Sequence, residues 1–203
     1  MECGFDLAKE KEDRITTALR NVIENDLRQS GAVSGFDRRR FDTVVRQTQT
    51  ENFDSTKLAK APDLWFKLRH DDEEPRAVLS TQDALFVECK PVDGDHSAGS
   101  AYCDDGLIRF IRGDYAWAMP EAMMIGYSRA GRTIPGDLVP AMSAPNRLAT
   151  LKTEALPTAV AQTEPSERAE TLYKSRHQRG FSWPDDKGPA TEITIYHSWH
   201  RCD

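Results

Sequence analysis

The segment LFVECKPV, residues 85–92, combines an apolar run typical of a strand with two charged side chains, Glu88 and Lys90. Side chains alternate between the faces of a strand, so these two share one face, about 7 Å apart at roughly 3.3 Å per residue. An earlier predicted strand, in APDLWF, opens with Asp63. Adjacent strands would bring Asp63 and Glu88 to one edge of a sheet; an ordinary salt bridge at a strand end is the alternative.

These residue types suit the chemistry of a hard divalent cation. Mg²⁺ binds carboxylate oxygens and keeps several waters, so Asp63, Glu88 and the backbone carbonyl of Cys89 would supply a partial shell for Mg²⁺ or Mn²⁺. The ammonium group of Lys90 would position or deprotonate an attacking water, or stabilise charge that develops on a phosphate. Asp83 is an alternative first carboxylate, but it lies on the same predicted strand as Glu88.

A third carboxylate comes from the first predicted helix, residues 8–29, which ends at Ser30-Gly31. Apolar residues recur in this helix at helical spacing, namely Ile15, Leu19, Val22 and Ile23. The same stripe, extended backward, reaches Glu12, and a carboxylate on a buried stripe is costly unless a partner compensates for it. The alternative is that Glu12 lies in the fraying first turn, where a Glu also suits the helix dipole.

The other predicted elements alternate between strands and helices. Strands are predicted within 41–50, from Asp63 onward, over 77–90, over 121–128, over 171–177 and over 191–199, with a helix over 101–118 that Pro120 stops and loops with one short helix over 131–170. This order implies a mixed sheet with helices on it, an α/β sandwich. The length of 203 residues suits one domain, with a core over about 8–128 and a C-terminal extension over 129–203.

The motif in this order of elements resembles the PD-(D/E)xK nuclease superfamily. Pro62-Asp63 and Glu88-Cys89-Lys90 match the family motif on either side of a predicted hairpin at 70–82. The family order of helix, three strands, helix and strand matches as well. The resemblance implies a restriction-endonuclease-like mixed sheet flanked by helices.

The resemblance also implies a role for the first helix. Some members of the superfamily carry a metal-binding or orienting glutamate there, a place that Glu12 occupies, with Glu24 the weaker choice. The activity that it implies is metal-dependent cleavage of nucleic acid, with DNA as the expected substrate, within a prokaryotic anti-phage or restriction system. The alternatives are a non-catalytic nuclease-fold subunit that binds a partner protein, and a nuclease that cleaves RNA.

Four basic residues are candidates for contact with substrate phosphates. Arg109 and Arg112 are three apart on one helical flank, and in the family a polar or basic residue on this helix can face the scissile phosphate. His177 and Arg179 are two apart on a predicted strand, where they would form a second phosphate clamp. The alternative for each pair is an ordinary surface position.

The charge balance bears on the partners. The chain has 27 basic and 33 acidic residues, a net charge of −6, whereas phosphate binding favours a basic surface. Weak binding of nucleic acid by the single chain is therefore expected, which favours a homo-oligomer or a partner protein. No apolar run approaches the roughly 18 residues of a membrane span, and the N-terminus lacks an apolar signal region, so a cytoplasmic protein without membrane contact is expected.

Cysteine and histidine raise two further questions. The four cysteines, Cys3, Cys89, Cys103 and Cys202, form no CxxC pair and are expected to be free thiols in a reducing compartment. His197, His200 and Cys202 are close enough in sequence to suggest a metal site. The favoured interpretation is a strand at the chain end with Trp199 packed inward, because no second ligand pair completes a tetrahedron.

Overall fold

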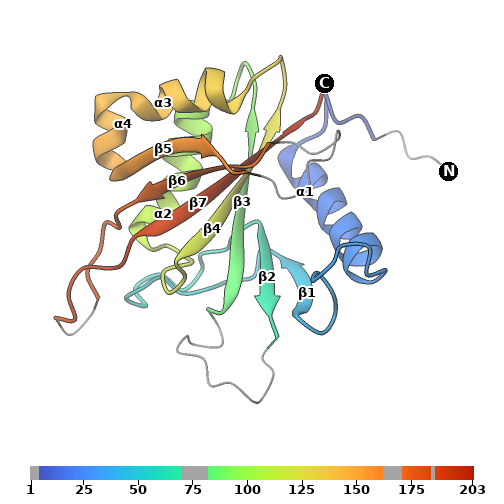
Figure 1. Cartoon of the computed structure of the whole chain (residues 1–203), viewed down its shortest axis with the longest axis horizontal. Helices are drawn as coiled ribbons and strands as arrows, with labels where there is room; N and C mark the ends of the chain where they lie inside the picture. Colours follow the sequence, from blue (N-terminus) through green and yellow to red (C-terminus); the bar gives the residue numbers. More distant parts are fainter. Residues whose placement is uncertain (1–4, 70–81, 162–170, 184–185) are drawn as a thin grey trace.

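A mixed β-sheet forms the centre of the molecule. The computed structural model describes residues 5–69, 82–161, 171–183 and 186–203, and in these ranges one seven-stranded sheet has the order β1-β2-β3-β4-β7-β6-β5 (Figure 1). The strands are β1 Phe41–Arg46, β2 Leu64–Leu68, β3 Ala84–Val92, β4 Glu121–Ser128, β5 Thr153–Ala159, β6 Tyr173–His177 and β7 Ile193–Arg201. The pairs β3–β4 and β4–β7 are parallel, and the other four are antiparallel.

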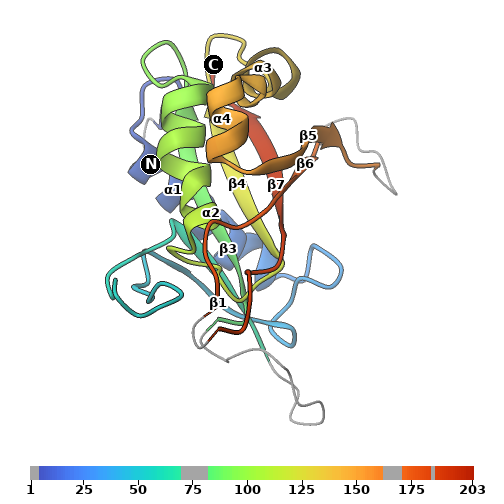
Figure 2. The same cartoon turned by 90° about the vertical axis from the view of Figure 1, so that its left-hand side faces the viewer.

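Helices cover both faces of the sheet (Figures 1 and 2). On one face lies α1 Glu12–Asn21, which continues as the π-helical segment η1 Val22–Arg28. The opposite face carries a set of helical segments: η2 Ala98–Leu107, α2 Ile108–Arg112, η3 Ile134–Leu138, α3 Val139–Ser143 and α4 Pro145–Thr150. The prediction of an α/β architecture with a mixed sheet flanked by helices is confirmed.

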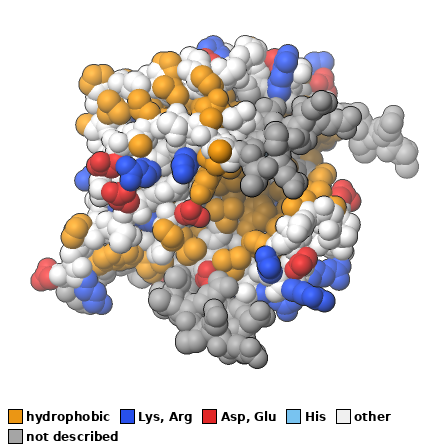
Figure 3. Space-filling model, in the orientation of Figure 1, with side chains coloured by type: hydrophobic (Ala, Val, Ile, Leu, Met, Phe, Trp, Pro, Cys, Tyr) orange, Lys and Arg blue, Asp and Glu red, His pale blue; other side chains and the backbone are white. Residues whose placement is uncertain are grey.

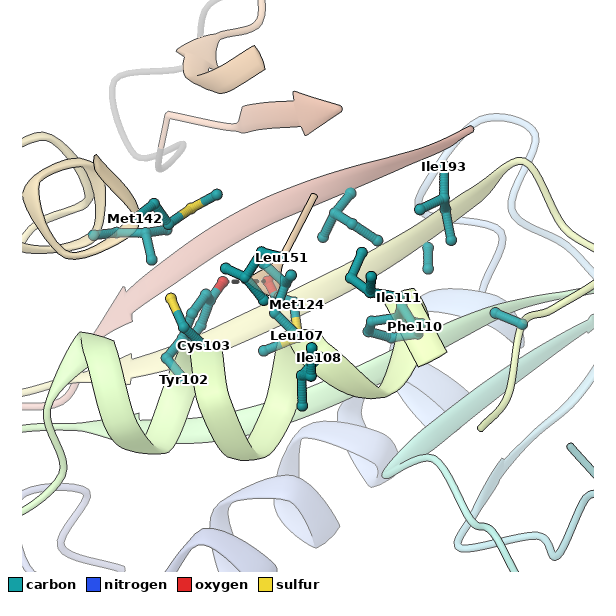
Figure 4. Packing of buried hydrophobic residues seen from close by; sticks show 14 of the residues in the cluster. Tyr102, Cys103, Leu107, Ile108, Phe110, Ile111, Met124, Met142, Leu151 and Ile193 are labelled. Atoms are coloured by element: carbon teal, nitrogen blue, oxygen red, sulfur yellow. Dashed lines mark hydrogen bonds between the residues drawn. The ribbon is translucent and has the colours of Figure 1, made fainter. Parts of the chain in front are cut away.

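The alternation of β3 separates two hydrophobic clusters. Val87 and Cys89 pack with Ile15 of α1, whereas Phe86 packs with the helices of the other face. Figure 4 shows the larger cluster, in which side chains of η2 and α2 point toward Met124 of β4. The two faces of one strand therefore anchor the two helical layers, and the charged residues of this strand lie near both.

The helix that follows β3 ends earlier than the sequence predicts. It stops at Gly113, which has the left-handed φ of 70°, and not at Pro120. A Cβ at position 113 would lie 2.6 Å from the ring of Phe181 and 3.0 Å from that of Phe53. Glycine therefore meets two demands here, a backbone turn and close ring contacts, and the chain turns back toward the sheet after α2.

The C-terminal residues complete the same sheet. The prediction of loops with one short helix over 131–170 is wrong, because η3, α3, α4 and β5 lie in this range. The two predicted C-terminal strands correspond to β6 and β7, and β7 pairs directly with β4 over eight residue pairs. Most of the predicted 70–82 hairpin lies outside the described residues. Among the described helices, none has the length and apolar content needed to cross a bilayer.

Candidate functional site

Asp63 and Glu88 meet where β2 and β3 begin to diverge. Leu64 pairs with Val87 in the antiparallel register, so Asp63, one residue before Leu64, lies across from Glu88. The Oδ2 atom of Asp63 accepts a hydrogen bond from the backbone N–H of Cys89 at 2.7 Å. This contact fixes the carboxylate of Asp63 beside β3. Asp63 and Glu88 therefore lie at the same edge of the sheet, as the sequence predicts.

The ammonium group of Lys90 lies among oxygens from three elements. Its Nζ atom is 2.7 Å from Oε1 of Glu88, 3.6 Å from Oε1 of Glu12 and 3.8 Å from Oδ2 of Asp63. It also donates to the backbone carbonyl of Cys89 at 2.9 Å. The structure therefore brings together all four residues that the sequence proposed for catalysis, together with the proposed carbonyl.

Close packing with a glycine holds the stem of Lys90. A Cβ at Gly106 of η2 would lie 3.2 Å from Cγ of Lys90 and 2.8 Å from the terminal methyl of Met124. The side chain of Lys90 is only 12% exposed. The helix thus approaches the strand closely at this point, and its contact directs the ammonium toward the carboxylates.

Glu88 is completely buried and has two further partners. Arg109 of α2 places Nη1 2.7 Å from the Oε1 atom that also binds Lys90. The hydroxyl of Tyr115 donates to the other oxygen, Oε2. Neither the spacing nor the sequence neighbours of Tyr115 indicate that its hydroxyl reaches Glu88.

The pKa values of the site reflect burial among charges of both signs. Burial, and then the charge of Asp63, raise the pKa of Glu88. Burial raises the pKa of Glu12 to about 7 despite the opposing charge of Lys90. For Lys90, burial favours the neutral form, but the three carboxylates outweigh it and raise the pKa. The ammonium therefore stays protonated, and Glu12 is the group that exchanges a proton near neutral pH.

The oxygen cluster fits a cation, and Lys90 supplies one. Three carboxylates face two cationic side chains, because Arg109 joins Lys90 at Glu88. Among the described residues, no three His, Cys, Asp or Glu side chains are arranged as the ligands of a metal ion. The contacts give the reason: both oxygens of Glu88 are occupied by donors, and an ammonium lies between the carboxylates. A metal ion at these oxygens would have to displace the ammonium of Lys90.

The remaining phosphate candidates lie in different surroundings. Arg109 belongs to the site, and its side chain is 37% exposed; Arg112 is exposed at the end of α2. His177 is fully buried and contacts Ser175 and a backbone carbonyl. The guanidinium of Arg179 is also buried and donates to backbone carbonyls of the 116–119 segment. The predicted clamp of His177 and Arg179 is therefore wrong, because neither side chain presents a free polar atom at a surface.

The alternative acidic residues have other partners. Glu24 pairs with Arg28 and accepts from the backbone N–H of Val44 at 3.1 Å, so it joins η1 to β1. Asp83 is buried just before β3. Both positions support the choice of Asp63 and Glu12.

The suggested metal trio near the C-terminus is not assembled. His197 faces Tyr102 and Ser175, whereas the Nε2 atom of His200 lies 3.1 Å from Ser198. Cys202 donates weakly to the backbone carbonyl of His200. The described cysteines, Cys89, Cys103 and Cys202, are free, as predicted, and all three are buried; Cys3 lies outside the described residues.

The site thus combines a buried carboxylate, two flanking carboxylates and a lysine that all converge from β2, β3 and α1. Comparison of the chain with protein-family models, with curated proteins and with solved structures found no match.

Proposed function

We propose that this chain is a metal-dependent endonuclease with a restriction-endonuclease-like fold that hydrolyses phosphodiester bonds of nucleic acid, with DNA as substrate. One observation carries the proposal: the ammonium of Lys90 lies within 4 Å of carboxylate oxygens from Glu12, Asp63 and Glu88. Two adjacent strands and a helix supply these residues, and α1, β1, β2, β3, η2–α2 and β4 follow one another in the order of the PD-(D/E)xK superfamily.

In this proposal Asp63, Glu88 and the carbonyl of Cys89 hold Mg²⁺ or Mn²⁺, and Glu12 completes the set of ligands. The cation would supply Lewis-acid stabilisation of the phosphate and a more acidic water. Lys90, moved aside from Glu88, positions the attacking water or donates to a phosphate oxygen.

Arg109 has a second task in the proposal. It is partly exposed while its guanidinium remains tied to Glu88. A guanidinium has five donors in a fixed plane, so one edge can hold the carboxylate while another reaches the scissile phosphate. Arg112 lies one helical turn further on and would contact a neighbouring phosphate.

A second candidate function is a non-catalytic subunit of the same fold that binds a partner protein. The observation that favours it is the satisfied state of Glu88, whose two oxygens already have three donors. On the described part of the face in Figure 3, acidic and basic side chains lie intermixed around a hydrophobic hollow. A nucleic-acid grip from a second copy or a partner, in the cytoplasm and within an anti-phage or restriction system, fits this surface and the net charge of −6.

A cleavage assay separates these functions. Plasmid, single-stranded DNA and RNA are incubated with the chain in Mg²⁺, in Mn²⁺ and in EDTA, and products are resolved on gels. We expect cleavage of DNA in either metal and none in EDTA. Glu88→Gln and Asp63→Asn should each lower the rate about 100-fold or more, because each removes a negatively charged ligand of the proposed metal ion.

Glu24→Gln is the matched control, since it removes a buried carboxylate whose partners are Arg28 and the backbone of Val44 and not Lys90. It should lower stability and leave the rate of the folded protein within about twofold. Wild-type rates in both site variants would reject the catalytic assignment. Cleavage of RNA alone would correct the substrate class.

A further inference from the structure

A cavity of about 570 Å³ adjoins the proposed active site, and Glu12 and Lys90 belong to its lining. It lies between the residues that lead into α1 and the loop that follows β3. Its other basic lining residues are Lys9, Lys11, His96 and Arg129. The site and the cavity are therefore continuous, and a strand held at the carboxylates would extend into the cavity.

Lys11 is the cation most available to a ligand in this cavity. It is exposed, and within the described residues it has no ion pair or side-chain hydrogen bond. Lys9, by contrast, pairs with Asp6 at 3.2 Å on the open surface. The lining also includes three carboxylates: Glu10 is compensated by Arg14 at 2.7 Å, Glu12 lies 3.6 Å from Lys90, and Asp105 of η2 is exposed. An anion that entered the cavity on the side of Lys11 would thus meet an ammonium that no carboxylate of the described residues pairs with.

His96, on the lining of the cavity, is held in a fixed orientation. Asp93 accepts hydrogen bonds at 2.9 Å from both the backbone N–H and the ring Nδ1 of His96. Arg129 braces the same carboxylate at 3.4 Å. These contacts use Nδ1 and leave Nε2 as the ring atom without a partner among the described residues. A ring fixed in this way can donate from Nε2 to an oxygen anion when it is protonated.

Arg129 joins the two walls of the cavity. Its Nη2 atom donates to the backbone carbonyls of Leu7 at 2.8 Å and Glu10 at 2.6 Å, while Nη1 reaches Asp93. The segment with Lys9 and Lys11 is thus tied to the loop with His96. The positive groups of the two walls therefore keep a defined separation.

We propose that this cavity is a phosphate-binding subsite, in which Lys11 and His96 hold a phosphate of the nucleic-acid strand next to the one that is cleaved. The proposal rests on the proposed function for its ligand, because continuity with Glu12 and Lys90 makes a strand phosphate the fitting anion. A phosphate binds through charge-assisted hydrogen bonds to ammonium and imidazolium donors. The group is either a terminal phosphate or an internal phosphodiester, which share this chemistry.

Binding without cleavage tests the subsite. Fluorescence anisotropy in EDTA, and again with Ca²⁺, measures the affinity of an eight-nucleotide DNA with and without a 5′-phosphate, and inorganic phosphate serves as competitor. The double variant Lys11→Gln, His96→Gln should weaken binding about tenfold or more, in line with the strength of charged hydrogen bonds. The slope of log affinity against log salt should fall by about one unit.

Lys174→Gln is the matched control, since Lys174 is an exposed lysine on β6. It should bind as the wild type does. A terminal-phosphate site predicts that the double variant affects only the 5′-phosphorylated strand, whereas an internal site predicts equal losses for both. Unchanged binding in the double variant, or an equal loss in Lys174→Gln, overturns the subsite.

The outcomes for the subsite and for the nuclease are separable. If the wild type cleaves DNA and Glu88→Gln does not, but the double variant binds normally, the subsite is wrong and the proposed function stands. If no cleavage is seen and the double variant still loses phosphate-dependent binding, the subsite stands and the catalytic function falls.

Discussion

Two buried polar clusters of this molecule satisfy their groups in different ways. The Glu88 site, defined as Glu12, Asp63, Glu88, Lys90, Arg109 and Tyr115, gathers charges of both signs and adjoins a cavity. The histidine network, defined as Tyr102, Ser175, His177 and His197, is completely buried. Both consist of residue types that catalyse reactions in other proteins, and only the first borders an open space.

The contacts of the histidine network form one consistent chain of neutral hydrogen bonds. Nδ1 of His177 lies 2.9 Å from the carbonyl of Leu151, so this nitrogen carries the proton and Nε2 accepts from Ser175 at 2.7 Å. The Ser175 oxygen then accepts from Nε2 of His197 at 2.8 Å. Nδ1 of His197, at 3.1 Å, is the nearer of the two acceptors of the Tyr102 hydroxyl, the other being the carbonyl of Met124 at 3.3 Å. These tautomers follow from the pattern of partners.

Burial of reactive residue types therefore does not by itself indicate a functional site. In the histidine network every donor has an acceptor, and both rings are neutral because burial lowers their pKa values, to about 4 for His177 and about 3 for His197. In the Glu88 site carboxylates outnumber cations, so the cluster retains affinity for another cation. The excess of carboxylates beside a cavity is the feature that favours cation binding and catalysis at the Glu88 site.

Acidification should have the largest effect, and it acts through the histidine network. The unfolded rings take up protons below about 6.5, whereas the folded rings resist protonation down to about 4 and about 3. Their contribution to stability is therefore complete above pH 6.5 and is lost as the pH falls. At pH 5 the loss is roughly 2 kcal/mol for each ring. Urea unfolding between pH 7.5 and 5 measures it.

Ring signals in NMR spectra provide the direct check on that loss. Neither His177 nor His197 should titrate in the folded protein above pH 5. A midpoint near 6.5 for either buried ring would contradict the neutral chain of hydrogen bonds.

Ser175→Ala should be the most destabilising single substitution of the set. It removes the hydroxyl that joins the two rings and leaves Nε2 of His177 and of His197 without partners. A buried polar group that loses its partner costs about 1–3 kcal/mol, so the free energy of unfolding should fall by about 3 kcal/mol. The melting temperature should fall by roughly 6–12 °C. The cleavage rate of the folded fraction should stay unchanged.

Ser198→Ala is the matched control on the other face of β7, where the hydroxyl lies 3.1 Å from His200. Its cost should stay near 1 kcal/mol, typical of one ordinary hydrogen bond. Equal costs for the two serine variants would show that the network is no more tightly organised than the hydrogen bond on the opposite face of the strand.

The sequence predicted the backbone positions of the Glu88 site better than its contacts. Strand alternation placed Glu88 and Lys90 on one face, the proline-preceded strand start located Asp63, and the helical stripe selected Glu12. These features follow from local periodicities, which can be read directly from the sequence. The early stop of α2 coincides with a local signal, a glycine after the last helical residue. The contacts of Gly113 with the rings of Phe53 and Phe181 join residues distant in sequence, and no local pattern predicts them.

The histidine network and β5 show what long-range contacts decide. Ser175, His177 and His197 alternate on two strands whose pairing brings them together, and Tyr102 joins them from a helix distant in sequence. The sequence interpretation assigned His177 to phosphate instead, because alternation gives the shared face but not its direction. In β5, Pro157 and two register shifts weaken the strand pattern, and tertiary pairing overrides the local signal.

Tyr115→Phe should have a moderate effect and extends the comparison to the Glu88 site. The substitution removes the hydroxyl that donates to Oε2 of the buried Glu88 carboxylate. Hydrogen bonds to charged groups contribute about 1.5–3 kcal/mol, and here the lower part of that range is expected because Lys90 and Arg109 remain. Urea unfolding at pH 8 measures the loss, and DNA cleavage should slow about tenfold as Glu88 loses its fixed orientation.

Tyr196→Phe is the control for this prediction, since Tyr196 donates to the exposed Glu121 at 3.0 Å. Its effect on stability should stay below about 0.5 kcal/mol, as for other surface substitutions. If Tyr115→Phe is equally mild, the hydroxyl does not position Glu88.

Glu12→Gln should have the smallest effect on stability and a sign opposite to that of the histidines. In EDTA the folded pKa of Glu12 is about 7, above its ordinary value of 4.5, so its favourable contribution is complete below pH 4.5 and is lost as the pH rises through 7. The glutamine cannot ionise and avoids that loss. The free energy of unfolding of the variant should therefore equal that of the wild type near pH 4.5 and exceed it at pH 8 by about 1 kcal/mol, after allowance for partial exposure.

Saturating Mg²⁺ should reverse the order at pH 8, because ligand binding stabilises only the form that holds the metal. Urea unfolding at both pH values, with EDTA and with Mg²⁺, gives all four comparisons. If the glutamine variant gains as much stability from Mg²⁺ as the wild type does, Glu12 is not a metal ligand and serves only as an ion-pair partner of Lys90.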